Sequence, residues 1–207
     1  MNDRYAETDQ NIVSTARRLF AEKGILNTEM KDIGKAAGIG RSTLYRHFSC
    51  KESILFVLAK EALIRFVKSS KLSDGLVFDN GYEELRWQFY QMTDSMINHI
   101  EDVIFLRDFD VMFTKEFPQV QGSDSYEDYV RSREMICDMK ISYERGMSDG
   151  SIKKTDDMEF ILITMVNGCM AMAQRILPRE QVYVTEVDHG REIVEKHLEL
   201  MLQGIKA

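Results

Sequence analysis

The sequence predicts an all-α protein, and three observations lead to this prediction. Apolar residues recur at helical spacing in several segments, helix formers dominate the composition, and the 207 residues include only two prolines, Pro118 and Pro178. Hydrophobic residues make up 44% of the chain and charged residues 29%, which is typical of a soluble globular protein. A chain of this length can bury a substantial core, as one domain or as a small domain joined to a larger one.

The first predicted helix covers residues 8–23, where apolar side chains recur every three or four positions at Ile12, Ala16, Leu19 and Phe20. Thr8 or Asp9 can cap its start. Gly24 suits the left-handed backbone position that often ends a helix. This segment therefore has its own start, apolar face and end.

A second helix is predicted at residues 29–37, followed by a glycine turn and a short third helix at residues 41–47. At about 100° per residue, Leu44 lies roughly opposite the midpoint of Ser42 and Arg46. We therefore expect Leu44 to anchor the third helix to the domain. The side chains that project from it are then Ser42, Thr43 and Arg46 on the outer side, Arg41 and Tyr45 on one shoulder and His47 on the other.

The fourth helix is predicted to begin at the capping pattern Ser49-Cys50-Lys51-Glu52 and to reach about residue 69. It joins the N-terminal part to the rest of the chain without a flexible linker, and we expect domains at residues 1–52 and 53–207. The apolar pattern and the glycine and proline breaks predict further helices at residues 82–99, 101–116, 124–148, 157–177 and 187–204.

Charge is divided unevenly along the chain. The formal net charge is −7, yet residues 1–70 contain 12 Lys and Arg against 8 Asp and Glu, whereas residues 71–207 contain 15 against 26. The basic part can attract phosphate, while the acidic part should face away from a polyanion. Chance is the alternative, since acidic proteins are common in bacteria, but the basic part coincides with the glycine turn and the short polar helix.

A cationic, hydroxyl-rich helix after a glycine turn is suited to reading the major groove of DNA. Arg41 and Arg46 can each offer two donors to guanine, and the hydroxyl groups of this helix can bond to phosphate. Lys31 and Lys51 are point charges better suited to holding the DNA backbone. The sequence therefore predicts double-stranded DNA as a partner.

Each of these side chains also has a plainer explanation. Tyr45 could pack in part against the first helix, and Arg46 could be a solvated surface charge. His47 could donate to the DNA backbone or respond to pH, but a lone histidine in such a position is usually structural.

One group of motifs occurs in order along the N-terminal part: Ala16-Arg-Arg-Leu-Phe-Ala-Glu-Lys-Gly24, Asp32-Ile33, Ala37-Gly38-Ile39, Thr43-Leu-Tyr-Arg-His-Phe48 and Lys51-Glu52. In these motifs the chain closely resembles TetR-family transcriptional regulators, over about residues 12–58. The remainder is similar in architecture, with a looser likeness at residues 144–152. The resemblance implies an all-α homodimer, with a helix-turn-helix DNA-binding domain at residues 1–52 and a ligand-binding and dimerisation domain at residues 53–207.

The resemblance also implies site residues. By position, the DNA contacts of the recognition helix correspond to Arg41, Ser42, Thr43, Tyr45, Arg46 and His47. Lys51 falls where a lysine grips backbone phosphate, and Thr28 and Lys31 lie at the start of the preceding helix. Two glycines depart from the family pattern. Gly40 stands where a capping serine is common, and Gly34 replaces a usual alanine, at a cost of ~1 kcal/mol in helix stability.

Binding of DNA by one short helix is weak, so a two-fold dimer that places two such helices ~34 Å apart on a palindrome is expected. The last two predicted helices suit the subunit interface, because they combine small residues with a repeated apolar pattern. The expected interface residues are Gly168, Ala171, Val194, Leu198, Met201 and Leu202. An intramolecular core would explain the same pattern equally well.

The acidic part is rich in large, adaptable side chains that suit a hydrophobic cavity for an unknown small-molecule effector. The candidate pocket residues are Phe66, Trp87, Phe89, Met92, Met96, Phe105, Phe109, Tyr143 and Met170. The alternative is the ordinary core that any helical bundle of this size needs. Nearby acidic residues favour either a cationic ligand or a solvated face: Glu101, Asp102, Asp108 and Asp110.

Other classes of protein lack support in the sequence. It contains no glycine-rich phosphate loop and no His, Cys or carboxylate spacing typical of a metal site, so we expect no enzyme, no cofactor and no metal. Three distant cysteines, Cys50, Cys137 and Cys169, indicate a reducing compartment. The polar N-terminus and the short apolar stretch at residues 160–166 predict a cytoplasmic protein without a membrane segment. The remaining alternative is a TetR-like helical protein that binds a small molecule or a partner without regulating DNA.

Overall fold

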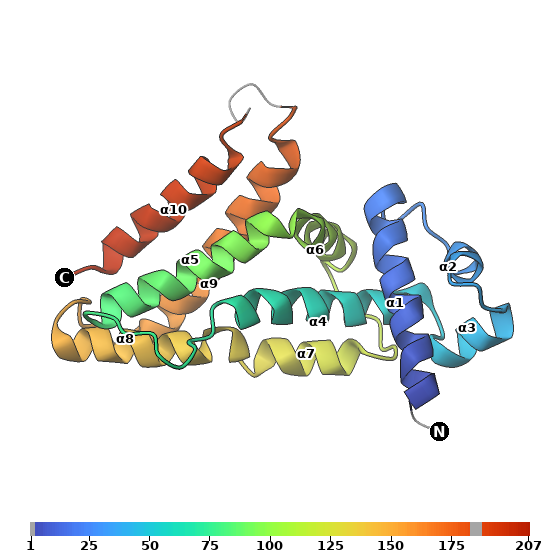
Figure 1. The fold of residues 1–207 in the computed structure, drawn as a ribbon, viewed down its shortest axis with the longest axis horizontal. Helices are drawn as coiled ribbons and strands as arrows, with labels where there is room; N and C mark the ends of the chain where they lie inside the picture. The colour runs from blue at the N-terminus through green and yellow to red at the C-terminus, as the bar shows by residue number, and fades with distance from the viewer. Residues whose placement is uncertain (1–2, 183–187) are drawn as a thin grey trace. The chain divides into compact units, whose positions relative to one another are not determined.

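The computed structural model describes residues 3–182 and 188–207, and the regular structure in these residues is helical (Figure 1). An isolated bridge pairs Ile152 with Lys206. The predicted all-α class is confirmed.

The four N-terminal helices are α1 (Asp3–Lys23), α2 (Met30–Ala36), α3 (Arg41–His47) and α4 (Lys51–Ser69). The bounds of α3 are those predicted from the sequence, and those of α2 and α4 agree closely. However, α1 begins at Asp3 and not at the predicted Thr8. Thr8 and Asp9 therefore lie inside the helix and do not cap it.

The later helices follow the predicted order with two differences. They are α5 (Gly81–Asn98), α6 (Ile100–Met112), α7 (Ser123–Arg131), the 3-10 turn η1 (Glu134–Ile136), α8 (Cys137–Asp149), α9 (Met158–Ile176), the 3-10 turn η2 (Leu177–Arg179) and α10 (Gly190–Ile205). The single helix predicted at residues 124–148 is divided, because Arg133 takes a left-handed conformation with φ of 57°. α6 ends at Met112, before the predicted residue 116. The predicted start at residue 187 lies outside the described residues.

Packing divides the chain into two compact units. Unit 1 comprises Met1–Ala62 and Phe105–Ser132, and unit 2 comprises Leu63–Ile104 and Arg133–Ala207. Helices α4 and α6 each contribute residues to both units. This division by packing differs from the functional division predicted at residue 52, which stays a prediction.

Unit 1 contains the N-terminal helices and an aromatic cluster. The apolar stripe of α1 is buried, with Ile12 and Ala16 fully inaccessible. Four rings surround Phe56 with centroid distances of 5.2 to 5.7 Å: Phe109, Phe113, Phe117 and Tyr126. Phe105 packs between Phe20 and Phe109. Phe105 and Phe109, predicted to line a ligand pocket, are thus partners in this cluster.

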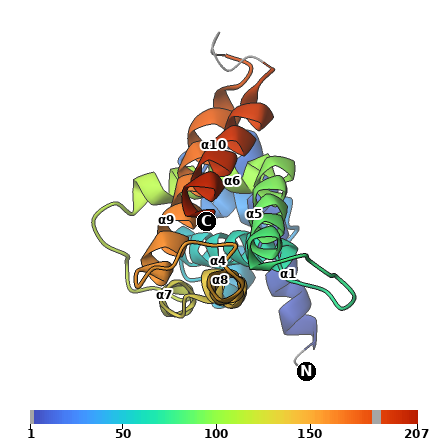
Figure 2. The same ribbon diagram turned by 90° about the vertical axis from the view of Figure 1, so that its left-hand side faces the viewer.

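Unit 2 is built around α5, which packs against α8, α9 and α10. Figures 1 and 2 show α5 and α8 side by side. Their backbones come so close that a Cβ atom on Gly81 would lie 2.1 Å from the Gly146 nitrogen. The crossing of these two helices therefore requires glycine.

Helix α10 corrects the predicted dimer interface. Val194, Leu198 and Leu202 are at most 1% exposed, because α10 turns this face toward α9 and α5 of its own chain. Gly168 allows the close approach, since a Cβ atom there would lie 3.0 Å from the Met201 sulfur. The intramolecular alternative is therefore correct for Val194, Leu198 and Leu202.

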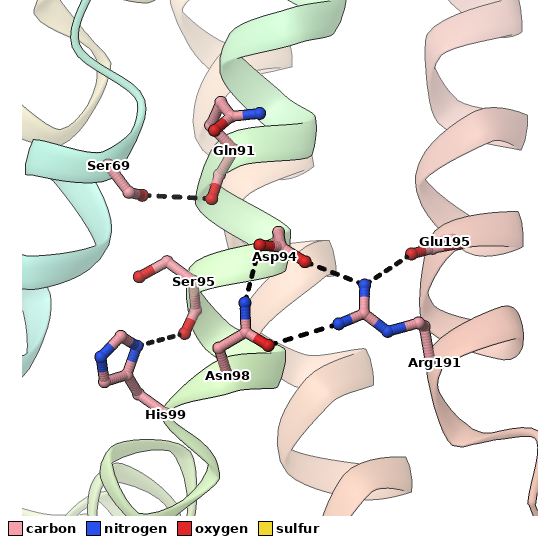
Figure 3. A network of polar contacts seen from close by, with 8 residues as sticks. All are labelled: Ser69, Gln91, Asp94, Ser95, Asn98, His99, Arg191 and Glu195. Atoms are coloured by element: carbon pink, nitrogen blue, oxygen red, sulfur yellow. Dashed lines mark hydrogen bonds and ion pairs between the residues drawn. The ribbon is translucent and has the colours of Figure 1, made fainter.

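A polar network ties the start of α10 to the end of α5 (Figure 3). The Arg191 guanidinium donates to Asp94 at 2.8 Å, to Glu195 at 3.1 Å and to Asn98 at 3.4 Å. The hydrogen bond to Asp94 raises the pKa of Arg191 above its usual value. In the same unit, the Ser69 hydroxyl donates to the Gln91 carbonyl at 3.2 Å.

One apolar segment extends beyond residues 160–166, the apolar stretch identified in the sequence. Met158–Arg179, which covers α9 and η2, is long and apolar enough by length and composition to cross a membrane. This is weak evidence, because the core helix of a soluble protein passes the same test.

Candidate nucleic-acid interface

The loop between α1 and α2 is fixed by its own residues. Gly24 takes a left-handed conformation with φ of 81° and ends α1. The Thr28 hydroxyl donates to the Gly24 carbonyl at 2.9 Å. At the start of α2, the Glu29 backbone N–H donates to the Asp32 carboxylate at 3.0 Å, which satisfies one of the free donors of the helix terminus.

The turn between α2 and α3 brings these helices into close contact. Gly38 has φ of 69°, and the Ile39 N–H donates to the Gly34 carbonyl at 3.0 Å. A Cβ atom on Gly34 would lie 3.3 Å from Leu44 Cδ2, closer than most real contacts of this kind. The glycine that departs from the family pattern thus gives Leu44 space against α2.

The outward side of α3 is cationic and polar. Leu44 is 1% exposed and anchors the helix, whereas Arg41, Ser42, Tyr45 and Arg46 are exposed and Thr43 is half-buried. The Arg41 guanidinium lies over the Tyr45 ring, 5.4 Å from its centroid. Helical spacing thus predicts the exposed side correctly except for Thr43, which is less exposed than expected. The contact of these side chains with DNA stays a prediction.

His47 is not on this surface, which corrects its assignment as a DNA contact. Its residue is 3% exposed, and its Nδ1 atom lies 2.6 Å from the Asp9 carboxylate oxygen. The Tyr5 ring stacks on it at a centroid distance of 4.0 Å. The Tyr5 hydroxyl also donates to the Arg46 carbonyl at 3.3 Å. His47 therefore joins α3 to α1, which is the structural role left open by the sequence.

The structure corrects the predicted DNA contact of Thr28, whereas the phosphate contact of Lys51 stays a prediction. Thr28 is fully buried, so its hydroxyl cannot reach DNA. Lys51 is half-buried, and its ammonium donates to the Ile25 carbonyl at 2.8 Å and to the Thr28 carbonyl at 3.1 Å. The ammonium of Lys51 thus holds the loop after α1, and only its third N–H is left for a phosphate.

A hollow of about 350 Å³ lies between α2 and α3 on the exposed side. Lys31, Lys35 and Arg41 are among its lining residues, together with Tyr45. The Lys31 ammonium pairs with the Glu29 carboxylate at 2.8 Å, and this contact raises the pKa of Lys31. Lys35 was not selected from the sequence. Its only signal there is that it lies one helical turn after Lys31.

The candidate pocket residues other than Phe105 and Phe109 belong to unit 2. Five of them are at most 1% exposed: Phe66, Phe89, Met92, Met96 and Tyr143. Trp87 and Met170 are half-buried, and the Trp87 ring packs against Phe78 at 5.9 Å. A surface hollow of about 470 Å³ in this unit is lined by a different set, Met147, Ser148, Lys154, Thr155 and Asp156. The effector pocket stays a prediction.

The predicted acidic residues include two with arginine partners. Arg65 donates to Asp102 at 2.9 Å, and Arg107 donates to Asp108 at 2.7 Å. Glu101 and Asp110 are exposed. A solvated face, the alternative given by the sequence, therefore fits the exposed Glu101 and Asp110 but not the buried Asp102.

The long helix α1 and the short helices α2 and α3, the last of which presents arginines on its free side, define a helix-turn-helix domain of the kind that docks on DNA. The family model described as bacterial regulatory proteins, tetR family, matches residues 12–58. Residues 12–58 are therefore similar to the DNA-binding domain of TetR-family transcriptional regulators.

Relatives and solved structures give the extent of the likeness. An HTH-type transcriptional regulator of Staphylococcus aureus (strain bovine RF122 / ET3-1) is 40% identical over 65 residues, which are 31% of this chain and 35% of that protein. The matches thus span about a third to a half of the length of the curated relatives.

Two solved structures share the fold over almost the whole chain. The fatty acid degradation regulator FadR from Bacillus halodurans has a TM-score of 0.70 at 17% identity, covering 98% of this chain and 96% of its own. The ketosteroid transcriptional regulator KstR2 of Mycobacterium tuberculosis has a TM-score of 0.59 at 20% identity, covering 100% and 97%.

Proposed function

We propose that the chain is a transcriptional repressor that binds a palindromic operator as a homodimer and is released by a small-molecule effector. The exposed cationic side of α3, held by buried Leu44, is the observation that carries this proposal. Its family is typical of the bacterial cytoplasm, where the three free thiols Cys50, Cys137 and Cys169 are expected to stay reduced.

The contacts with DNA divide into two kinds. Arg41 and Arg46 read guanine in the major groove, and the hydroxyl groups of Ser42, Thr43 and Tyr45 bond to phosphates or base edges. Lys31 and Lys35, beside the hollow between α2 and α3, attract the DNA backbone. Lys31 contributes less charge than Lys35, because the Glu29 carboxylate already neutralises it.

A second copy of the chain is expected to cover the exposed side of α9. Phe160 is 73% exposed and Ala171 is also exposed, three turns further along the helix. Leu200 on α10 is 63% exposed. Of the predicted interface residues, Gly168, Ala171 and Met201 retain accessible surface and stay candidates. A dimer through this surface gives the two copies of α3 that a palindrome requires.

The effector is expected to act through α4, which is one unbroken helix from Lys51 to Ser69. A ligand that favours one arrangement of unit 2 would tilt this helix and change the spacing of the two recognition helices. A coupling free energy of ~1–3 kcal/mol would lower DNA affinity 5- to 150-fold. The names of FadR and KstR2 refer to fatty acid degradation and to ketosteroids, which supports a largely apolar effector.

Genomic footprinting of the full chain, followed by titration of the bound sequences at several salt concentrations, tests the proposal. We expect a palindromic site and an affinity that falls steeply with salt. The alternative, a TetR-like protein that binds a small molecule or a partner without regulating DNA, predicts no enriched site and no salt-dependent retention on heparin. Sedimentation at micromolar concentration tests the dimer, and a monomer at all salt concentrations would contradict it.

A further inference from the structure

Gln88 is a fully buried polar side chain without a hydrogen-bond partner. It lies on α5 and is 0% exposed, and neither its amide nitrogen nor its oxygen has a partner among the described residues. Another buried polar group of α5 is satisfied. Glu84 accepts from the Ser142 hydroxyl at 2.9 Å and pairs with Arg145. Both polar atoms of the Gln88 carboxamide are thus unpaired, whereas the Glu84 carboxylate on the same helix is satisfied.

The packing of α5 on α8 gives the surroundings of Gln88. The two helices run antiparallel, since Gly81 meets Gly146 and Glu84 meets Ser142 (Figures 1 and 2). One more turn along this register places Gln88 opposite Met139. The side chains expected around it are apolar and at most 1% exposed: Leu85, Met92, Met139 and Tyr143. Two of these are methionines, which adapt readily to the shape of a ligand.

A carboxamide buried without partners disfavours the folded state, because it has lost its hydrogen bonds to water and gained none. A molecule that offers an acceptor and a donor at this position would supply the missing partners. The buried carboxylates of unit 2, Glu84 and Asp102, are each paired with an arginine. A charged ligand would thus meet no free opposite charge from them, whereas a neutral ligand would meet a free donor and a free acceptor.

We propose that Gln88 is the polar anchor of the effector site, and that the effector is a mainly apolar molecule carrying a neutral group with a donor beside an acceptor. A primary amide, a lactam or a protonated carboxylic acid has this edge and can form two hydrogen bonds with a carboxamide. The inference rests on the proposed function, since it assigns the chemistry of the expected effector site.

Octanamide is a suitable probe, and N,N-dimethyloctanamide is its match without a donor. Binding to the full chain is measured by calorimetry, and the melting temperature is followed in parallel. Gln88→Met removes the amide with little change of shape, and Gln91→Met makes the same change one turn away at a half-buried glutamine (Figure 3). We expect octanamide to bind the wild type and the Gln91→Met variant equally, and the Gln88→Met variant at least about tenfold more weakly.

The dimethyl compound keeps only its carbonyl acceptor, so it should bind the wild type more weakly than octanamide and lose less affinity on Gln88→Met. Equal binding of octanamide by both variants, or no binding by the wild type, overturns the proposal. So does a lower melting temperature of free Gln88→Met, because the amide would then already have a partner. Salt-dependent DNA binding by the free wild type is measured separately. Its absence would overturn the regulator function while the octanamide result still decides the role of Gln88.

Discussion

Two buried polar side chains, His47 in unit 1 and Gln88 in unit 2, differ sharply in their surroundings. The His47 ring has the Asp9 carboxylate at 2.6 Å and the Tyr5 ring stacked on it. The Gln88 carboxamide has no partner in the described part of the chain. The recognition helix is thus positioned by groups of its own unit. The core of unit 2 instead retains hydrogen-bonding capacity that its own residues do not use.

The exposed surfaces of the two units differ in a related way. The free side of α3 presents arginines, whereas α9 exposes a phenylalanine, Phe160, at 73%. A cationic surface fits a polyanion, and an apolar one fits another protein surface. We therefore expect a different kind of partner for each unit.

The largest expected effect is on the anchor of the recognition helix. Leu44→Ala should lower the free energy of unfolding by about 2–5 kcal/mol, because Leu44 is buried between α2 and α3. Leu26→Ala is the matched control, since Leu26 is 79% exposed and should change stability by less than about 0.5 kcal/mol. Urea unfolding measures both. Similar values for the two variants would show that α3 does not depend on Leu44.

Substitutions of an arginine and of a lysine at the DNA interface should affect DNA binding in different ways. Arg46→Ala should lose about 1–3 kcal/mol of discrimination at one base pair, because it removes a bidentate contact to a base. Lys35→Ala should weaken all sequences alike and reduce the salt slope by about 1. Titration of operator variants at several salt concentrations separates the two. Lys51 is a poorer control than Lys35, because its ammonium also holds the loop after α1.

A uniform loss across every operator variant for Arg46→Ala would make Arg46 a backbone contact. A base-specific loss for Lys35→Ala would reverse the assignment of the two residues.

The pairing of His47 with α1 gives a smaller expected effect. His47→Leu should lower the free energy of unfolding by about 1–2 kcal/mol, because it removes a hydrogen bond to a charged group and the stacking on Tyr5. Asp9→Asn keeps an acceptor in place and should lose less. Chemical unfolding at pH 7 measures the two variants. Unchanged stability of His47→Leu would mean that the contact with Asp9 contributes nothing to holding α3.

Local signals in the sequence were enough to predict α2, the glycine turn and α3, because caps, glycines and the burial of Leu44 all act within a few residues. The start of α1 was predicted too late, because Thr8 and Asp9 are residues that often cap a helix. In the structure the Asp9 carboxylate instead contacts the ring of His47, 38 residues away. The break between α7 and α8 was missed for a similar reason. No glycine or proline marks Arg133, which takes a left-handed conformation there.

The candidate sites were predictable to different degrees. Helical spacing alone orients Arg41, Tyr45 and Arg46, whereas the burial of Thr28 depends on how α1 and α2 pack in three dimensions. An apolar pattern at three or four residues does not say which chain covers it. The sequence pattern at Val194 and Leu198 therefore fits a dimer interface as well as an intramolecular core. The structure assigns both residues to the core.

The smallest expected effect is an increase in stability and not a loss. It tests the contrast between the paired His47 and the unpaired Gln88 directly. Gln88→Met should raise the free energy of unfolding of the free protein by about 1 kcal/mol, because it replaces an unpaired buried amide by an apolar side chain of similar length. The melting temperature should rise by about 2–4 °C for a chain of this size. Gln91→Met, at a half-buried position, should leave both quantities almost unchanged.

The sign of this change decides between two explanations of Gln88. If Gln88→Met stabilises the protein, the Gln88 carboxamide lowers the stability of the free wild type. We would then expect this carboxamide to form its hydrogen bonds with a bound effector. A destabilised variant means that the amide has a partner in the free protein, such as an ordered water. In that case Gln88 would resemble His47, and the contrast between the two units would disappear.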